Sequence, residues 1–451
     1  MPATILAHAF GERYDLPIPL LLFVLGGALV VLLSFALIAR RPVAVNAGVP
    51  AADAAALLPV RPGSAAVSLL GFALLAAVGL LGSQEVSENL LPTVFWLLVW
   101  IAVPLSCGLL GDWTQPANPF ANLAKLTGRE RFRRAVLGRE APVAWPSWLG
   151  WWPAVLLYFL LACGELVFQR SATLPQVTAV ALLVYLGVSA FCGLLFGPAW
   201  LQRGEVFSVL MSTWGRLGYL RFGAPGRRGF TGGLDAGFAA TPSRLAFVLL
   251  LLVSVNVDGL LATPAWSNLQ LRLPEAIGPG GLEALTVLGF VLLAAAVAAL
   301  FAGFALAAAR IGGRQVSALT ALTGLLPSLL PIAFGYLLAH NLQYLLVNAQ
   351  LLIPLVGNPT GLASWPVHLP APFNDSFAVH LNVLPSSAYW YLAFVTIVVV
   401  HVVAVRLAHR HFAQNSAHGA RRSEYPWLVA MVGYTMLSLW LLAQPLVLEH
   451  A

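Results

Sequence analysis

Long apolar runs separated by short polar stretches make up most of the chain. A helix needs about 20 consecutive apolar residues to cross the hydrocarbon core of a bilayer, and about ten runs approach that length. They cover residues 17–39, 65–82, 90–110, 149–168, 177–200, 245–261, 282–309, 319–346, 388–408 and 427–447. The pattern predicts an all-α integral membrane protein with about ten transmembrane helices in a single polytopic domain, residues 1–451.

The composition agrees with this prediction and excludes a soluble protein with one membrane anchor. Of the 451 residues, 59% are hydrophobic and 9% are charged, whereas soluble domains carry about 25% charged residues. The formal net charge of +7 does not indicate nucleic-acid binding, because no aromatic-rich basic domain lies outside the apolar runs. Cys107, Cys163 and Cys192 all lie in apolar runs without C-x-x-C spacing, which argues against disulfides and thiolate metal sites.

The basic residues predict the orientation of the chain. When the ten predicted helices alternate, one side of the membrane receives all of the 24 Lys and Arg residues except Arg13, Arg170 and Arg272. Lys and Arg concentrate in cytoplasmic loops, so both termini are expected outside. Residues 1–17 lack the basic segment of a signal peptide, so no cleavage is expected.

Two of the expected cytoplasmic loops, residues 111–148 and 201–243, contain amphipathic basic stretches. The apolar positions of the first are Phe120, Leu123, Phe132 and Val136, and those of the second are Val206, Phe207, Leu210, Trp214 and Leu217. Such segments bind the membrane interface and anionic lipid, so both loops are expected to form short helices lying on the membrane. The alternative is that their arginines only set the topology.

The same loops follow two similar sequences. Cys107-Gly-Leu-Leu-Gly precedes Trp113, Cys192-Gly-Leu-Leu-Phe-Gly precedes Trp200, and both tryptophans begin the pattern W-x6-F-x7-G-R. The third and fourth predicted helices therefore resemble the fifth and sixth in the same orientation. Parallel repeats of this kind place sites at the repeat interface in other membrane proteins, although Gly/Leu-rich sequences also match by chance.

The longest loop on the opposite side of the membrane spans residues 347–387. It is rich in Pro, Asn and Gly and also contains Trp365, Phe373 and Phe377. Loops of this length are usually either functional or disordered. The aromatic residues favour an ordered extracytoplasmic cap.

Candidate chemistry centres on residues 325–350, an apolar stretch interrupted by Pro327 and Pro331, where bends are expected, and polar at its outer end. On a helix, one face of this stretch carries Tyr336, His340, Gln343 and Tyr344. An ionisable side chain in a spanning helix normally faces protein or water, which makes it a functional-site hypothesis.

Two acids on the repeated helices are expected at a depth similar to that of His340. Glu165 and Asp258 follow the starts of their helices by roughly 16 and 13 residues, which puts them about 24 Å and about 20 Å above the cytoplasmic boundary. The polar residues Glu85, Asn256 and Tyr344 are expected to surround them. The prediction is a polar site open to the outer, periplasmic side.

Glu165, Asp258 and His340 are the predicted metal ligands and catalytic residues. Two carboxylates and an imidazole suit a divalent cation, of unspecified identity, with an open position for water. A bound metal lowers the pKa of that water towards about 7 and so supplies hydroxide for hydrolysis. The chain has no tight ligand motif such as H-E-x-x-H. The same groups could instead relay protons or ions or form a structural hydrogen-bond network.

The remaining histidines suit simpler roles. His401 is expected in the inner half of the membrane, too far from His340 to pair with it, as a buried core side chain. His409, His411 and His418 lie among arginines and are expected in a solvated basic loop. The inner half then holds only His401 and Asp112 as polar candidates, which argues against a transport path. No nucleotide-binding loop or nucleophile elbow is present in a suitable context.

Several segments together resemble one known family. They are AHAFGERYDLPIPL, NLLPTVFWLLVW, GDWTQPANPF, NVDGLLATPAW, LLPIAFGYLLAHNLQYLL, YWYLAFVTIVVVH and SEYPWLVAMVGYTMLSLWLL. In this order they are similar to a bacterial family of polytopic membrane proteins, some of which are named membrane-bound fenitrothion hydrolase. The resemblance implies a location in the bacterial inner membrane and cleavage of organophosphate esters, and it assigns no catalytic residue.

The sequence therefore favours a membrane-embedded, metal-dependent hydrolase of organophosphate-type esters. A transporter or ion-coupled permease and a non-catalytic subunit of a larger membrane complex remain the alternatives. The expected partners are the lipid bilayer, an apolar small molecule and, for the third alternative, a membrane subunit.

The hydrolase prediction has a direct chemical test. Purified protein should contain a divalent metal, and Glu165→Gln and His340→Ala variants that still fold should lose hydrolysis of an aryl phosphotriester, because each removes a predicted ligand. Elemental analysis and a hydrolysis assay check both points. Full activity in both variants would contradict the predicted site.

Overall fold

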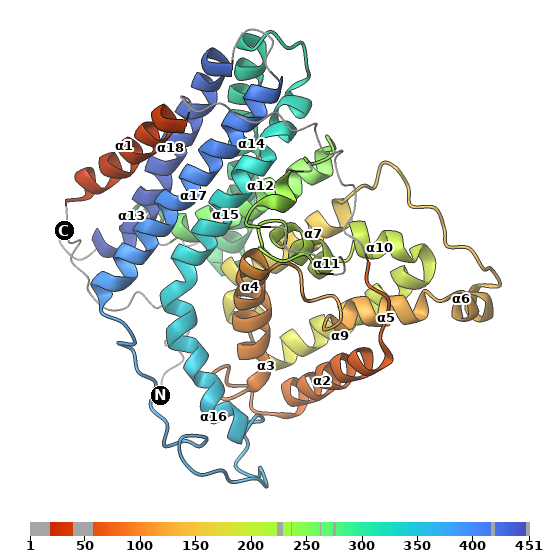
Figure 1. Cartoon of the computed structure of the whole chain (residues 1–451). Coiled ribbons are helices and arrows are strands. Elements are labelled where there is room, and N and C mark those ends of the chain that lie inside the picture. The colour runs from red at the N-terminus through yellow and green to blue at the C-terminus, as the bar shows by residue number, and fades with distance from the viewer. Residues whose placement is uncertain are drawn as a thin grey trace. The chain divides into compact units, whose positions relative to one another are not determined.

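The computed structural model describes residues 19–38, 57–222, 229–235, 237–261, 263–273, 277–415 and 420–447 (Figure 1). Nine helices in this part of the chain are long and apolar enough to cross a membrane. The prediction of a helical, multi-pass membrane protein is therefore confirmed for the described residues. The predictions made for residues 1–17 and for His418 lie outside them.

The nine helices correspond to nine of the ten predicted runs. They are α1 (Leu20–Ile38), α2 (Pro62–Leu81), the continuous helix Leu90–Leu110, α9 (Pro175–Phe196), α12 (Pro242–Leu261), α14 (Gly278–Ile311), α15 continuing into α16 (Ala318–Gly357), α17 (Ser386–Asn415) and α18 (Ala420–Val447). The run 149–168 instead contains α7 (Trp152–Leu166), with 15 residues. Such a helix is about 22 Å long, less than the roughly 30 Å of a hydrocarbon core.

Shorter helices connect these elements. They are α5 (Pro119–Thr127), α6 (Glu130–Leu137), α8 (Gln169–Ala172), α10 (Pro198–Arg203), α11 (Val206–Trp214), η3 (Gly232–Leu234), α13 (Pro264–Arg272) and η5 (Ala349–Leu351). The helix Leu90–Leu110 is composite, with α3 (Leu90–Pro92), the π-helix η2 (Thr93–Ala102) and α4 (Val103–Leu110). Pro104 has no N–H for an α-helical bond, and the wider π turns directly precede it.

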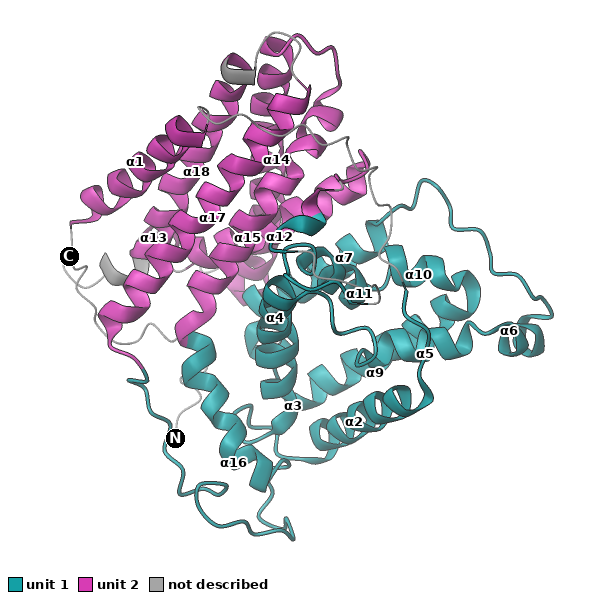
Figure 2. Cartoon of the chain, in the orientation of Figure 1, with its two compact units in different colours: residues 1–9, 54–233, 344–383 teal, residues 10–53, 234–343, 384–451 magenta. Residues whose placement is uncertain are grey.

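The described chain forms two compact units, where the sequence pattern predicted a single domain (Figure 2). Unit 1 comprises residues 1–9, 54–233 and 344–383, and unit 2 comprises residues 10–53, 234–343 and 384–451. Helix α15 begins in unit 2 and ends in unit 1. Each unit has its own set of packed helices, described separately below.

In unit 1 the short helices α5 and α11 are part of the core. Helix α5 packs against α9, and α11 packs against α4. The rings of Phe120 and Phe207 stack with their centroids 5.2 Å apart. Most of the apolar side chains expected against lipid are buried within the protein, namely Phe120, Val206, Phe207, Leu210, Trp214 and Leu217. Of the two predicted interfacial faces, only the α6 residues Phe132 and Val136 are exposed.

The buried carboxylate of Glu205 joins the starts of α5 and α11. Glu205 is the N-cap of α11 and accepts hydrogen bonds from the amides of Phe207 at 3.2 Å and Ser208 at 2.7 Å. It also accepts from the Tyr185 hydroxyl at 2.7 Å and the Asn118 amide at 2.9 Å. Asn118 is itself the N-cap of α5. These donors offset the desolvation of a charge that is fully buried.

In unit 2, α18 packs against α1, α12, α14 and α17. The core includes Phe23, Tyr336, Ile397 and Leu439. Helix α12 is buried on nearly every side. Helix α15 continues as a regular helix through Pro327 and Pro331.

The predicted cap loop begins as helix and continues as irregular chain. Helix α16 (Leu352–Gly357) and the residues after it belong to unit 1. The Gln350 side chain donates to the carbonyl of His380 at 2.9 Å and accepts from its amide at 3.0 Å. The amides of Ser83 and Leu90 donate to the carbonyls of Thr360 and Pro359 at 2.7 and 3.0 Å. The loop is thus hydrogen-bonded to the turn between α2 and α3.

Close packing of α5 on α9 generates a prediction about two glycines of α9. A Cβ at Gly193 would lie 2.5–2.6 Å from backbone and Cβ atoms of Ala124, whereas a Cβ at Gly187 would meet nothing within 4 Å. Gly193→Ala should destabilise the protein by about 1–3 kcal/mol through overpacking. Gly187→Ala, the matched control, should stabilise it by up to about 1 kcal/mol because alanine favours helix. Thermal unfolding in detergent measures both, and equal shifts would contradict the packing.

Candidate functional site

Asp258 and His340 meet inside unit 2, as their predicted depths suggested. The Asp258 Oδ2 and His340 Nε2 atoms are 2.5 Å apart, and both side chains are largely buried. Asp258 lies near the carboxyl end of α12, and His340 lies near the carboxyl end of α15. Two helices that are separate in sequence thus bring a carboxylate and an imidazole into direct contact.

A set of polar aromatic and amide groups surrounds this pair. The Tyr336 ring, one turn before His340, lies parallel to the imidazole with centroids 6.3 Å apart. A Cβ at Gly259 would lie 3.2 Å from the Tyr336 hydroxyl oxygen, so the absence of a side chain there allows this approach. The amide of Asn256 donates to the Tyr434 hydroxyl. Within unit 2, α12, α15 and α18 therefore contribute to one polar cluster.

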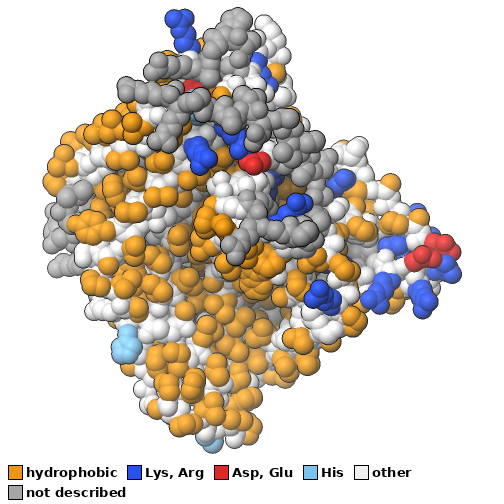
Figure 3. Space-filling model, in the orientation of Figure 1, with side chains coloured by type: hydrophobic (Ala, Val, Ile, Leu, Met, Phe, Trp, Pro, Cys, Tyr) orange, Lys and Arg blue, Asp and Glu red, His pale blue; other side chains and the backbone are white. Residues whose placement is uncertain are grey.

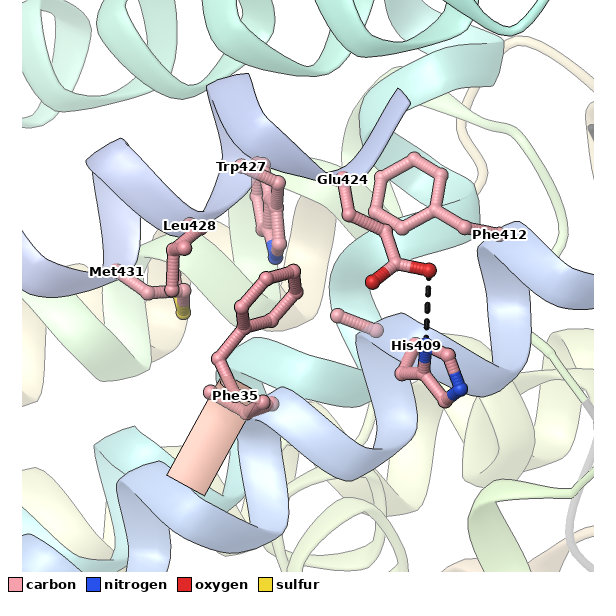
Figure 4. A pocket seen from close by; sticks show the side chains of 9 residues that line it. Phe35, His409, Phe412, Glu424, Trp427, Leu428 and Met431 are labelled. Carbon is pink, nitrogen blue, oxygen red and sulfur yellow. Dashed lines mark hydrogen bonds and ion pairs between the residues drawn. The ribbon is translucent and has the colours of Figure 1, made fainter. Parts of the chain in front are cut away.

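A second histidine–carboxylate pair lies elsewhere in unit 2 (Figure 4). The His409 Nδ1 and Glu424 Oε1 atoms are 2.8 Å apart, and both side chains are buried. The prediction that His409 lies in a solvated basic loop is wrong, because α17 continues as a helix to Asn415 and buries one face throughout. Glu424 lies in the first turns of α18.

The second pair borders a small cavity between α1, α17 and α18. Its lining includes Phe35, Phe412, Trp427 and Met431, with Phe412 beside the carboxylate and Met431 at the opposite end in Figure 4. The cavity volume is about 10 Å³, enough for about one water molecule. The Trp427 indole N–H is buried and has no hydrogen-bond partner among the described residues. The cavity is thus mostly apolar, with a few polar groups at one side.

His401 lies on α17, one of the two helices that hold the second pair. It is fully buried, as predicted, and its Nδ1 lies 2.7 Å from the carbonyl oxygen of Ile397. His401 and His409 are eight positions apart on the same helix, which corresponds to about 12 Å. No direct contact between His401 and either pair is observed in the described residues.

Glu165 belongs to unit 1. Its Oε2 accepts a hydrogen bond from the indole N–H of Trp100, on η2, at 2.6 Å. The predicted neighbours Glu85 and Tyr344 also belong to unit 1. The structure therefore brings together two of the three predicted ligands, and among the described residues no three His, Cys, Asp or Glu side chains gather closely enough to hold a metal ion.

Asp112, a candidate from the sequence, follows the end of α4 in unit 1. Its carboxylate accepts hydrogen bonds from the amide of Thr114 at 3.1 Å and from the Thr114 hydroxyl at 2.8 Å. Burial raises the pKa of Asp112 above its usual value, although the bonds from Thr114 oppose this effect. Burial also lowers the pKa of Lys125, whose ammonium donates to the carbonyl of Leu58 at 3.0 Å. Lys125 thus connects α5 to the chain that precedes α2.

Comparisons with known proteins add no assignment. No protein-family model matches the chain, and neither a curated protein nor a solved structure is detectably similar to it. The resemblance carried by the quoted segments stays a prediction. The function must therefore be inferred from the two buried pairs and their surroundings.

The raised pKa of Asp112 predicts how stability depends on pH. An unfolded aspartate titrates near pH 3.9, so folding favours the protonated form, and this contribution is lost as the pH rises through the higher folded pKa. Asp112→Asn should therefore be more stable than the wild type at pH 7, and the difference should shrink as the pH is lowered through the raised pKa of Asp112. Melting temperatures of both proteins across this range test it. A difference in melting temperature between the two proteins that grows as the pH falls would contradict the raised pKa of Asp112.

Proposed function

We propose that unit 2 is a proton-conducting membrane transporter in which two buried histidine–carboxylate pairs bind the proton. The observation that carries the proposal is the His409–Glu424 pair, 2.8 Å apart and buried. The sequence offers only His401 and Asp112 as polar candidates in the inner half of the membrane. The His409–Glu424 pair adds a buried acid and an imidazole near the α17–α18 connection, which we place in that half.

The chemistry of each pair suits reversible proton binding. Histidine is the side chain that normally changes charge between pH 5 and 8. A neighbouring carboxylate stabilises the imidazolium and can accept a proton when the imidazole is neutral. Ionisable groups inside a membrane are costly, so they usually mark ion or proton pathways. Asp258–His340 and His409–Glu424 would be the outer and inner proton-binding sites.

Polar groups between the pairs could shorten the proton path. On α18, Glu424 and Tyr434 are separated by about 15 Å, and on α17, His401 lies about 12 Å from His409. The Tyr434 hydroxyl is bonded to Asn256, two residues before Asp258. Gaps of this length need a chain of several waters between the side chains, and the cavity beside Glu424 has room for about one of them.

The hydrolase implied by the resemblance is the second candidate. The observation that favours it is the 2.5 Å contact of Asp258 with His340, because a carboxylate-oriented imidazole can take a proton from water as a general base. Those two side chains would also be the residues that hold a divalent ion. Glu165, the third predicted ligand, is bonded to Trp100 within unit 1.

We further propose that α7 is the tenth crossing and that both termini lie outside. The amide of Val143 donates to the carbonyl of Leu195 near the carboxyl end of α9, and the Thr178 hydroxyl donates to the carbonyl of Ala172 near its amino end. The chain that contains α7 thus connects the two ends of a 22-residue helix. An even number of crossings, with the basic loops inside, gives the proposed orientation.

The parallel helix-pair repeat is proposed on local geometry. The helices α5 and α11 both have nine residues, and the N-cap of each lies five residues after a tryptophan, Trp113 or Trp200. In both, the N-cap side chain accepts hydrogen bonds from the backbone. They end at Gly128 and Gly215. Each packs against the long helix that precedes the other, as a duplicated pair related by a two-fold axis would.

Proton flux through proteoliposomes tests the transport proposal. A potassium diffusion potential should drive proton uptake, read by an internal pH dye, and Asp258→Asn and Glu424→Gln should each reduce the rate by roughly tenfold or more, because each removes a proton acceptor. Asp235→Asn is the matched control, since it removes an exposed acid paired with Arg410 and should leave the rate unchanged. Wild-type flux equal to that of protein-free liposomes would contradict the proposal.

The same variants separate the two candidates. Hydrolysis of an aryl phosphotriester that is lost in Asp258→Asn and retained in Glu424→Gln would favour the hydrolase, because only the first variant removes the Asp258–His340 base. Loss of proton flux in both variants, without measurable hydrolysis in the wild type, is the result expected for the transporter.

A further inference from the structure

Helix α6 presents an apolar face that no described part of unit 1 covers. Phe132 and Val136 are four residues apart, on one side of the helix, and are 47% and 56% exposed. Many other exposed large apolar side chains of the chain lie on the candidate spanning helices, where lipid covers them. Helix α6 has only eight residues and cannot span a bilayer, so its apolar face needs a different covering.

Arg133, the residue after Phe132, attaches α6 to the end of the candidate spanning helix α9. Its buried guanidinium donates to the carbonyls of Leu194 at 2.8 Å, Glu140 at 2.9 Å and Gly128 at 2.7 Å. Leu194 lies in the last turn of α9, whose carbonyls have no partner within the helix. The arginine thus satisfies one of them and holds α6 at the carboxyl end of α9.

This attachment places α6 at the edge of the hydrocarbon layer. Helix α9 has 22 residues and is about 33 Å long, close to the roughly 30 Å of a hydrocarbon core. The level of its last turn is therefore the level of the lipid headgroups. An apolar face at this level meets the boundary between acyl chains and phosphates.

The charges around the face are predominantly positive. Between Gly128 and Glu140 the chain has five arginines and two glutamates, and Figure 3 shows basic and acidic groups gathered over this part of unit 1. Arg134 pairs with both glutamates, at 2.8 and 2.5 Å. Arg129, Arg131 and Arg139 are exposed as well. Guanidinium groups bind phosphate oxygens through parallel hydrogen bonds.

We propose that α6 docks on anionic phospholipid at the membrane surface. Phe132 and Val136 enter the upper acyl-chain region, and the exposed arginines bind the headgroup phosphates. The occupant is an anionic lipid surface because an apolar face bordered by excess positive charge, at headgroup level, matches it in both chemistry and position. This inference is independent of the transport proposal, since α6 lies in unit 1.

Hydrogen–deuterium exchange of the full chain in nanodiscs tests the docking. Amides of residues 130–137 should exchange roughly tenfold more slowly in discs containing phosphatidylglycerol than in phosphatidylcholine discs, because docking suppresses local opening of a short helix. The double variant Phe132→Ser/Val136→Ser should lose this protection. Arg131→Gln, which keeps the apolar face, should lose most of the difference between the two lipids. Amides of the buried α5 should not change in any sample.

Two outcomes would overturn the proposal. Equal exchange in both lipids, fast or slow, would mean that α6 does not recognise anionic headgroups. Protection in phosphatidylglycerol that survives the double variant would mean that the apolar face does not enter the membrane. A size-exclusion profile and a melting temperature that match the wild type show that each variant is folded, so that loss of protection reports docking.

Discussion

The burial of ionisable groups in an apolar helix bundle is the constraint on which this structure depends. A carboxylate in hydrocarbon is strongly disfavoured unless it is hydrogen-bonded, paired or protonated. Unit 2 meets this constraint twice, with Asp258–His340 and His409–Glu424, and unit 1 meets it with four donors around Glu205. The two units differ chemically in the groups that surround each buried carboxylate. Glu205 is surrounded by groups that do not titrate near neutral pH, whereas each acid in unit 2 faces an imidazole.

That difference separates a structural role from a functional one. Glu205 connects the starts of two short helices, and its removal would leave buried donors without an acceptor. A histidine–carboxylate pair can gain or lose a proton while keeping its hydrogen bond, so it can change charge without separating the helices that hold it. Small residues such as Gly259 then allow neighbouring hydroxyls to approach the pair. The proposed proton path uses this property of the pairs.

The sequence was informative where one physical signal dominated. Apolar length identified the nine candidate spanning helices of the described residues, because any helix that crosses lipid needs such a length. Asp258 and His340 were predicted at similar depths in the membrane, because the constant rise per residue of a helix gives the depth of each position. The same reasoning could not pair Glu165 with Trp100, since the partner of a side chain depends on how helices rotate and pack. His409 was misassigned because its neighbours are arginines. A signal was present, since the buried positions Ile397, His401, Val405 and His409 continue one helical face.

Nitrogen-15 NMR of histidine-labelled protein in bilayers tests the central claim most directly. Among the signals of the nine histidines, we expect those of His340 and His409 to change from neutral to charged imidazole as the pH is lowered, the first altered only by Asp258→Asn and the second only by Glu424→Gln. That result would establish two separate proton-binding pairs. Imidazole signals for His340 and His409 that keep one charge state as the pH is lowered would contradict the account.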